Sequence, residues 1–168
     1  MTMPKIDKYH LGMAGEYAVC SELCKREYDA SITLGNAKAV DIMVFRPNNS
    51  YCRIEVKTSQ TTKFVTNFFQ KYYDKTLNNH PDYWVIVHID KDNGQTRYFI
   101  LTHEELAEIQ MKRNGMSTWG KVNGCDNVLL RDVAHCEDQW SKIKWYLYYY
   151  VITGVGLSRA HAGFLYNL

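Results

Sequence analysis

Two short β-branched runs, separated by a Pro-Asn-Asn-Ser turn, constrain the fold of this chain more than any other feature. Residues 40–46 and 51–58 have the composition of two strands joined by that turn. Each run nevertheless carries charge where a plain hairpin would carry apolar or uncharged residues. The first run contains Asp41, and the second contains Glu55 and Lys57. The pattern predicts an antiparallel strand pair whose charged residues need a separate explanation.

The hydrophobic pattern of the two runs also predicts their register. Alternate residues of a strand share a face, so Glu55 and Lys57 lie together on one face of the second run. The opposite face of that run is apolar and would pack with the apolar face of the first run: Cys52, Ile54 and Val56 with Ile42 and Val44. This pairing sets odd-numbered residues opposite odd-numbered ones and brings Asp41 near Glu55 and Lys57. A slip of one residue would move Asp41 to the other face.

A cluster of two carboxylates and one amine has a chemical use. Two ionised carboxylates a few Å apart repel each other unless a compensating charge lies between them. Mg²⁺ commonly takes one or two carboxylates together with water and substrate phosphate. The lysine could then orient or deprotonate an attacking water, or neutralise charge that develops at a phosphate. The alternative is a solvated charged face, in which a cross-strand ion pair adds about 0.2–1 kcal/mol.

The residues resemble the PD-(D/E)XK nuclease superfamily over residues 12 to 101. The resemblance is carried by a helix bearing Glu16, a strand, "VD" on a second strand and "EVK" on a third. Within the superfamily the arrangement is most similar to archaeal-type Holliday junction resolvases and related small restriction-like endonucleases. The resemblance implies an α/β fold with a restriction-endonuclease-like core, in which a mixed β-sheet is flanked by helices.

The resemblance also implies roles for individual residues. Asp41 and Glu55 match the metal ligands, and Lys57 matches the catalytic lysine. Val56 would offer its backbone carbonyl to the metal, and Glu16 matches an accessory acid on the first helix. The proline that usually precedes the first acid is replaced here by Val40.

A second group of residues is expected to contact nucleic-acid phosphates. The polar tail after the motif and the nearest lysine form this group: Thr58, Ser59, Gln60 and Lys63. Lys71 and Lys75 extend the same basic patch in sequence, although a solvated basic face is an equal alternative.

The implied function is metal-dependent endonucleolytic hydrolysis of DNA with Mg²⁺ or Mn²⁺, with branched or junction DNA among the implied substrates. A homodimer is expected, because one site cuts one strand and two-fold symmetry matches that of duplex DNA. Two alternatives stay open. One is a catalytically silent nuclease-fold module that binds DNA or protein, and the other is a hydrolase that acts on RNA or free nucleotides.

The remaining pattern predicts one domain, with a nuclease-like core over 12–101 and a helical or irregular extension over 102–168 packed on it. The other predicted strands cover 30–34, 83–89 and 96–101, with a turn at 92–94 between the last two. Helices are predicted over 12–28 and after Thr102, where Thr102 and Glu105 form the cap. A loop over 115–127 and a final helix from about 136 follow, and the apolar face of that helix consists of Trp140, Ile143 and Leu147. The helix over 12–28 is expected to bury Met13, Tyr17, Cys20, Leu23 and Cys24.

Composition excludes little. The chain has 168 residues and is 46% hydrophobic, which suits one globular domain and argues against disorder. A formal charge of +2 permits a nucleic-acid partner without indicating one. Five cysteines and a polar, charged beginning of the chain favour reduced thiols in the cytoplasm. Residues 145–157 are too short an apolar run to cross a bilayer, so no membrane partner is expected. The aromatic run at 145–151 is expected to pack in the core or against a second copy.

Overall fold

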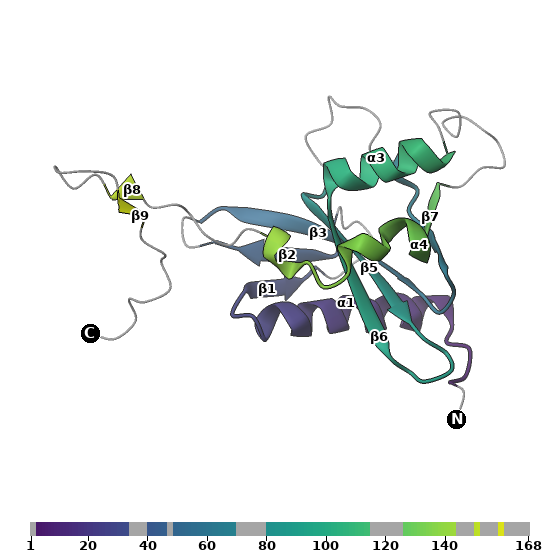
Figure 1. Ribbon diagram of the computed structural model, residues 1–168. Coiled ribbons are helices and arrows are strands. Elements are labelled where there is room, and N and C mark those ends of the chain that lie inside the picture. The colour runs from purple at the N-terminus through teal and green to yellow at the C-terminus, as the bar shows by residue number, and fades with distance from the viewer. Residues whose placement is uncertain are drawn as a thin grey trace.

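The computed structural model describes residues 3–33, 40–46, 49–69, 80–114, 126–143, 150–151 and 158–159. A five-stranded mixed sheet has the order β1-β2-β3-β5-β6 (Figure 1). Its strands are β1 (Asp29–Ile32), β2 (Ile42–Phe45), β3 (Tyr51–Ser59), β5 (Tyr83–Ile89) and β6 (Thr96–Thr102). β3 and β5 run parallel, and the other neighbouring pairs are antiparallel. The predicted α/β class with a mixed sheet flanked by helices is confirmed.

Helix α1 (Lys8–Cys24) covers one face of the sheet (Figure 1). It begins earlier than the predicted 12–28 because the side chain of Asp7 accepts hydrogen bonds from the amides of Tyr9 and His10. The predicted buried face was wrong in part, since Tyr17 and Cys24 are exposed. The residues of α1 that are buried are Gly15, Glu16, Val19 and Leu23.

Strand β5 is buried along its whole length because both faces of the sheet are covered at this strand. Val85 and Val87 pack in a cluster with Val19 and Leu23 of α1. On the other face, Trp84 and Ile86 pack in a second cluster that includes four side chains from other elements: Phe64, Phe68, Phe69 and Leu106. The continuous apolar strand predicted at 83–89 is confirmed.

The hairpin of β5 and β6 and the helix that follows it also agree with prediction. Gly94, in the predicted turn, has a φ of 72°. Helix α3 (His103–Asn114) begins with the predicted capping box. The amide of Glu105 donates to Thr102 Oγ1 at 3.2 Å, and the amide of Thr102 donates to Glu105 Oε2 at 2.9 Å.

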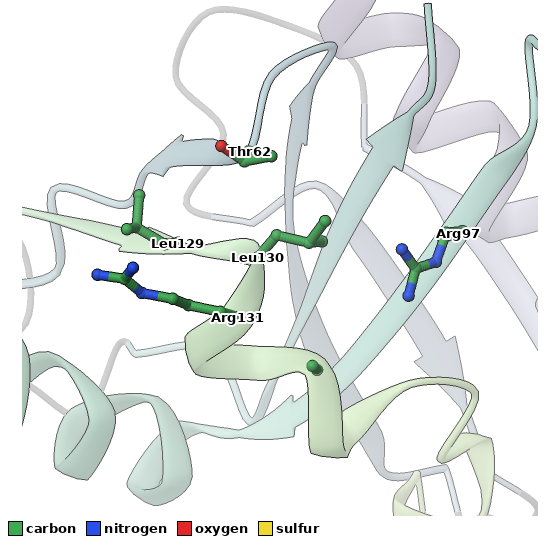
Figure 2. Close-up of a pocket in the computed structure, with 6 residues that line it drawn as sticks. Thr62, Arg97, Leu129, Leu130 and Arg131 are labelled. Atoms are coloured by element: carbon green, nitrogen blue, oxygen red, sulfur yellow. The ribbon is translucent and has the colours of Figure 1, made fainter. Parts of the chain in front are cut away.

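A small antiparallel sheet of β4 (Lys63–Val65) and β7 (Asn127–Leu129) packs on the α3 side. The loop expected over 115–127 therefore ends earlier, because Asn127 already belongs to β7, and residues 115–125 lie outside the described part. A pocket of about 380 Å³ opens beside β7 (Figure 2). Its lining residues are Thr62, Arg97, Leu129, Leu130, Arg131 and Ala134.

The helix predicted from about residue 136 is wrong for the described residues. The chain instead forms α4 (Leu130–Val133) and two 3₁₀ turns, η2 (Ala134–Cys136) and η3 (Trp140–Lys142). Asp138 between the two turns has a φ of 52°, which a right-handed helix does not accommodate. Trp140 and Ile143 still pack in the α1-side cluster.

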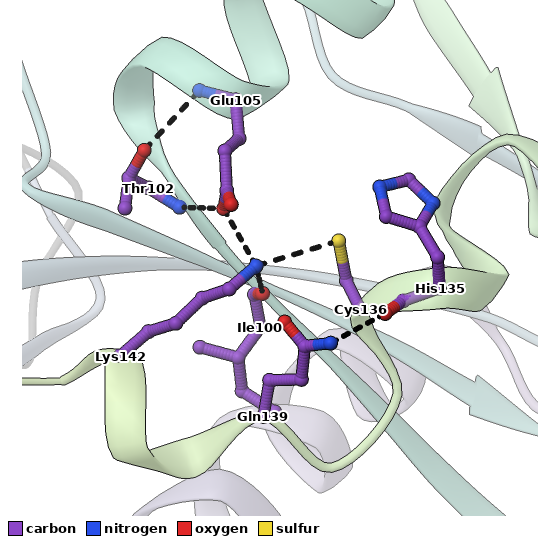
Figure 3. A network of polar contacts seen from close by, with 7 residues as sticks. All are labelled: Ile100, Thr102, Glu105, His135, Cys136, Gln139 and Lys142. Atoms are coloured by element: carbon purple, nitrogen blue, oxygen red, sulfur yellow. Dashed lines mark hydrogen bonds and ion pairs between the residues drawn. The ribbon is translucent and has the colours of Figure 1, made fainter.

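Lys142 fastens this segment to the sheet (Figure 3). Its Nζ donates to Ile100 O at 3.1 Å and to Glu105 Oε2 at 2.7 Å, and it lies 3.5 Å from Cys136 Sγ. The two-residue strands β8 (Tyr150–Val151) and β9 (Ser158–Arg159) pair with each other. Leu147 and most of the aromatic run lie outside the described residues.

The cysteines of the described part, Cys20, Cys24, Cys52 and Cys136, are free thiols. Burial raises the pKa of Cys52 to about 11 and also raises that of Cys136. These buried thiols are therefore protonated near neutral pH. Among the described residues, no helix has the length and apolar character needed to cross a membrane.

Candidate functional site

The register of β2 and β3 is the one that the hydrophobic pattern predicted. Ile42 lies opposite Ile54, and Met43 lies opposite Arg53. Odd-numbered residues therefore share one face of the two strands, and the apolar even-numbered residues share the face that α1 covers.

Asp41 directly precedes the first residue of β2, and its exposed fraction is 8%. Its amide donates to Ile54 O at 3.1 Å. Its Oδ2 accepts a hydrogen bond from the amide of Val56 at 2.8 Å. The carboxylate therefore lies against β3 at the residue between Glu55 and Lys57.

Glu55 and Lys57 form an ion pair on the odd-numbered face of β3. Glu55 is 4% exposed, and its Oε1 lies 2.6 Å from Lys57 Nζ. The ammonium also lies 5.9 Å from the ring centroid of Trp84, within the range of a cation–π interaction. Trp84 is directly opposite Glu55 in the parallel ladder of β3 and β5. Lys57 is therefore held between a carboxylate and an indole ring.

His103 contacts Trp84, and His80 stacks on His103. Trp84 Nε1 donates to His103 Nδ1 at 3.3 Å. The rings of His103 and His80 stack with centroids 4.2 Å apart and planes inclined by 32°. Burial lowers the pKa of His103 to about 4, and repulsion from His80 acts in the same direction. His103 is therefore neutral near pH 7 and keeps the acceptor that orients the indole.

Sequence patterns did not indicate that Trp84, His80 and His103 belong to the site. Trp84 lies in a continuous apolar strand, and its alignment with Glu55 depends on a parallel pairing that no local pattern reveals. His80 and His103 are separated along the chain and lack the spacing of a familiar motif.

Glu16 is buried on α1, the helix that covers the even-numbered face of β3. Glu55 and Lys57 belong to the odd-numbered face. In the described ranges, no group of three or more His, Cys, Asp and Glu side chains is arranged to hold a metal ion. The role of Glu16 as an accessory ligand stays a prediction.

The predicted phosphate-contacting residues fall into two pairs. Gln60 is buried, and its amide group binds the backbone of the N-terminal segment, with Nε2 donating to Pro4 O at 3.2 Å and Oε1 accepting from the amide of Ile6 at 3.0 Å. Thr58 faces α1, and its buried Oγ1 has no hydrogen-bond partner. Gln60 therefore ties the N-terminal segment to the end of β3, and a phosphate contact by Gln60 or Thr58 stays a prediction.

The other pair, Ser59 and Lys63, reaches solvent at the end of β3 and the start of β4. A phosphate contact by either residue stays a prediction. Lys71 and Lys75 lie outside the described residues.

The fold of the chain is similar to one that has been solved before. The sequence matches no protein-family model and no curated protein. The structure is similar to that of the bacterial homing endonuclease I-Ssp6803I, with a TM-score of 0.51 and 12% sequence identity over 83% of this chain and 92% of that one. The chain therefore shares the fold of this endonuclease. A Holliday junction resolvase, Hjc from Archaeoglobus fulgidus, aligns with a TM-score of 0.48 and 12% identity over 81% of this chain and 98% of that one.

Proposed function

We propose that this protein is a metal-dependent endonuclease that hydrolyses phosphodiester bonds of DNA. The observation that carries the proposal is the placement of two buried carboxylates, Asp41 and Glu55, around Val56, with the ammonium of Lys57 on Glu55. Burial of ionised groups is costly even when they are paired. Apolar residues at these positions would stabilise the sheet more, so the charged residues indicate a role other than stability.

The donor set fits a hard divalent cation. Asp41 and Glu55 offer carboxylate oxygens, which Mg²⁺ and Mn²⁺ prefer. The amide of Val56 points to Asp41, and the carbonyl of the same residue points to the same edge of β3, just before the start of β2. We infer that Val56 O completes the ligand set and that Glu16 assists it. A bound cation would polarise the scissile phosphate and stabilise the charge that develops on it.

Lys57 contributes the second positive charge. Its side chain is 22% exposed, whereas that of Glu55 is 5% exposed, so the ammonium is the member of the pair that a substrate reaches. In the proposed complex, Lys57 donates hydrogen bonds to the attacking water and to a phosphate oxygen. The indole of Trp84 excludes water from one side of Lys57, which strengthens these electrostatic interactions.

We further propose that two copies of the chain act together on duplex DNA, because each chain carries one such site and can cut one strand. The free thiols of the described part suit a reducing compartment, and we place the protein in the cytoplasm on that ground.

A cleavage panel tests the proposal with linear, branched, flapped and single-stranded DNA, and with RNA, in Mg²⁺ or Mn²⁺ and in chelator. We expect metal-dependent cutting of DNA, reduced at least about 100-fold by Lys57→Ala, since removal of one electrostatic group from such a site costs about that factor. Lys25→Ala is the matched control, because Lys25 is exposed and pairs with Glu22 on α1. Cutting of RNA alone, or of nothing in the panel, would contradict the proposal.

Calorimetry separates an enzyme from a silent binding module. We expect Mn²⁺ to bind the wild type and not the Asp41→Ala variant. Equal Mn²⁺ uptake by both proteins, or none by either, would show that Asp41 holds no cation.

A further inference from the structure

The face of β2 and β3 that carries the charged site continues toward the hairpin turn and ends in two exposed aromatic side chains. Phe45 and Tyr51 lie directly opposite each other in the ladder. Their exposed fractions are 41% and 51%. Both residues are odd-numbered, so they share a face with Asp41, Glu55 and Lys57.

One further cross-strand pair separates the aromatic residues from the site. Met43 lies opposite Arg53, and both are partly buried. The guanidinium of Arg53 lies 3.6 Å from Asp82 Oδ2. Along this face, starting at the turn, the aromatic pair comes first, Arg53 follows, and the site with Asp41 and Glu55 comes last.

The exposure of this pair contrasts with the rest of the same face. Phe64, Phe68 and Phe69 are all buried in the cluster beneath α3. On the even-numbered face, α1 covers β2 and β3. The described part of the chain therefore buries Phe64, Phe68 and Phe69 on one half of the odd-numbered face and leaves Phe45 and Tyr51 exposed on the other half.

We propose that Phe45 and Tyr51 form a stacking platform for an unpaired base, so that the preferred substrate is DNA with a branch, flap or other single-stranded nucleotide beside a duplex. The inference rests on the proposed function and names its substrate class. Aromatic side chains stack on any base whose face is free, and bases inside a duplex offer no free face. Arg53 and Lys57 on the same row pair with Asp82 and Glu55, and their remaining N–H donors would bind phosphates of the DNA backbone that links the platform to the site.

The spacing predicts where the cut falls. Tyr51 precedes Glu55 by four positions on one regular strand, which corresponds to about 13 Å at about 3.3 Å per residue. A duplex rises about 3.4 Å per base step, so the scissile phosphate lies about four nucleotides from the stacked base.

Binding without metal tests the platform independently of cleavage. A flapped duplex carries the fluorescent analogue 2-aminopurine at its first unpaired position, and it is titrated with protein in chelator. We expect quenching by the wild type and about a 5- to 100-fold loss of affinity for the flapped duplex in the Phe45→Ala/Tyr51→Ala variant, with affinity for linear duplex unchanged. Tyr17→Ala is the matched control, since Tyr17 is 57% exposed but lies on α1.

Each further outcome has a defined meaning. Equal losses on flapped and linear DNA, or the same loss in Tyr17→Ala, would overturn the platform. A change from dimer to monomer in the double variant with DNA affinity intact would instead identify the pair as a contact between two copies. If the protein binds and quenches but cuts nothing, the platform stands and the endonuclease proposal fails. If the protein cuts at positions independent of the branch, the platform fails and the endonuclease proposal stands.

Discussion

Substitution of Gly15 by alanine tests the close packing of α1 against β3 at Thr58. A Cβ at Gly15 would lie 1.8 Å from Thr58 Oγ1 and 2.9 Å from Thr58 Cβ. Rotation of the threonine side chain would move the hydroxyl but not the Cβ, so the helix and β3 must separate. Overpacking of this kind costs about 1–3 kcal/mol. The gain in helix propensity from glycine to alanine offsets about 1 kcal/mol of that cost.

Gly12 supplies a matched control in the same helix. A Cβ at Gly12 meets nothing within 4 Å, so Gly12→Ala retains only the gain in helix propensity. The difference in free energy of unfolding between the two variants therefore isolates the steric contact, at about 1–3 kcal/mol. Urea denaturation followed by circular dichroism measures it, and melting temperatures should differ by about 3–10 °C.

The same contact connects stability to the site. Glu16 follows Gly15, and Thr58 follows Lys57, so a separation of helix and strand displaces both parts of the proposed centre. We expect Gly15→Ala to lose cleavage activity, and Thr58→Ala added to it to restore part of the activity and the stability. Equal stability and activity of Gly15→Ala and Gly12→Ala would refute the close approach of α1 to β3.

Three further perturbations test other contacts. Burial lowers the pKa of His103 from 6.5 to about 4. Between these two pH values the unfolded chain binds a proton at this histidine and the folded chain does not. The free energy of unfolding should therefore fall by as much as about 3 kcal/mol as the pH drops from 6.5 to 4. His103→Gln should flatten that part of the stability profile measured by denaturant titration, and an unchanged slope would contradict the assignment. Lys142→Met removes the ammonium that donates to both Glu105 and Ile100 O, and should lower the free energy of unfolding by about 1–3 kcal/mol. An unchanged melting temperature would show that these hydrogen bonds do not stabilise the fold. The double change Glu55→Leu/Lys57→Met replaces a buried ion pair by apolar side chains, and should raise the free energy of unfolding by about 1–4 kcal/mol while abolishing cleavage; a less stable protein would show that the pair is kept for stability.

Local patterns were sufficient for the central strands and their connections. The alternation in residues 40–46 and 51–58 predicted the register of β2 and β3, because only one pairing buries the apolar residues together. Turn chemistry and the capping box predicted the β5–β6 hairpin and the start of α3, since both signals act within a few residues.

Long-range packing decided what the sequence left open. Tyr17 was expected inside, but the structure leaves it exposed and buries its neighbour Glu16. The seating of α1 depends on Gly15 and Thr58, which are distant in sequence. The helix expected from residue 136 has apolar residues at helical spacing, but Glu137 forms a bridge with Phe99 of β6, and the chain turns there instead. Such long-range contacts override the local periodicity, and the periodicity of the sequence does not reveal them.

The position of the charged pair on β3 follows from how the two halves of the sheet are covered. On the odd-numbered face, the half formed by β5 and β6 lies beneath α3 and its aromatic cluster, whereas Tyr51 at the start of β3 is open. Glu55 and Lys57 lie between these two environments. Nearer the turn, water would screen their charges and weaken any action on a substrate. Deeper under α3, the charges would be beyond the reach of a substrate and would lack solvent to offset their burial. The boundary between the covered and open halves is the place where a carboxylate can be nearly buried while its lysine remains accessible, and the sequence places its "EVK" there.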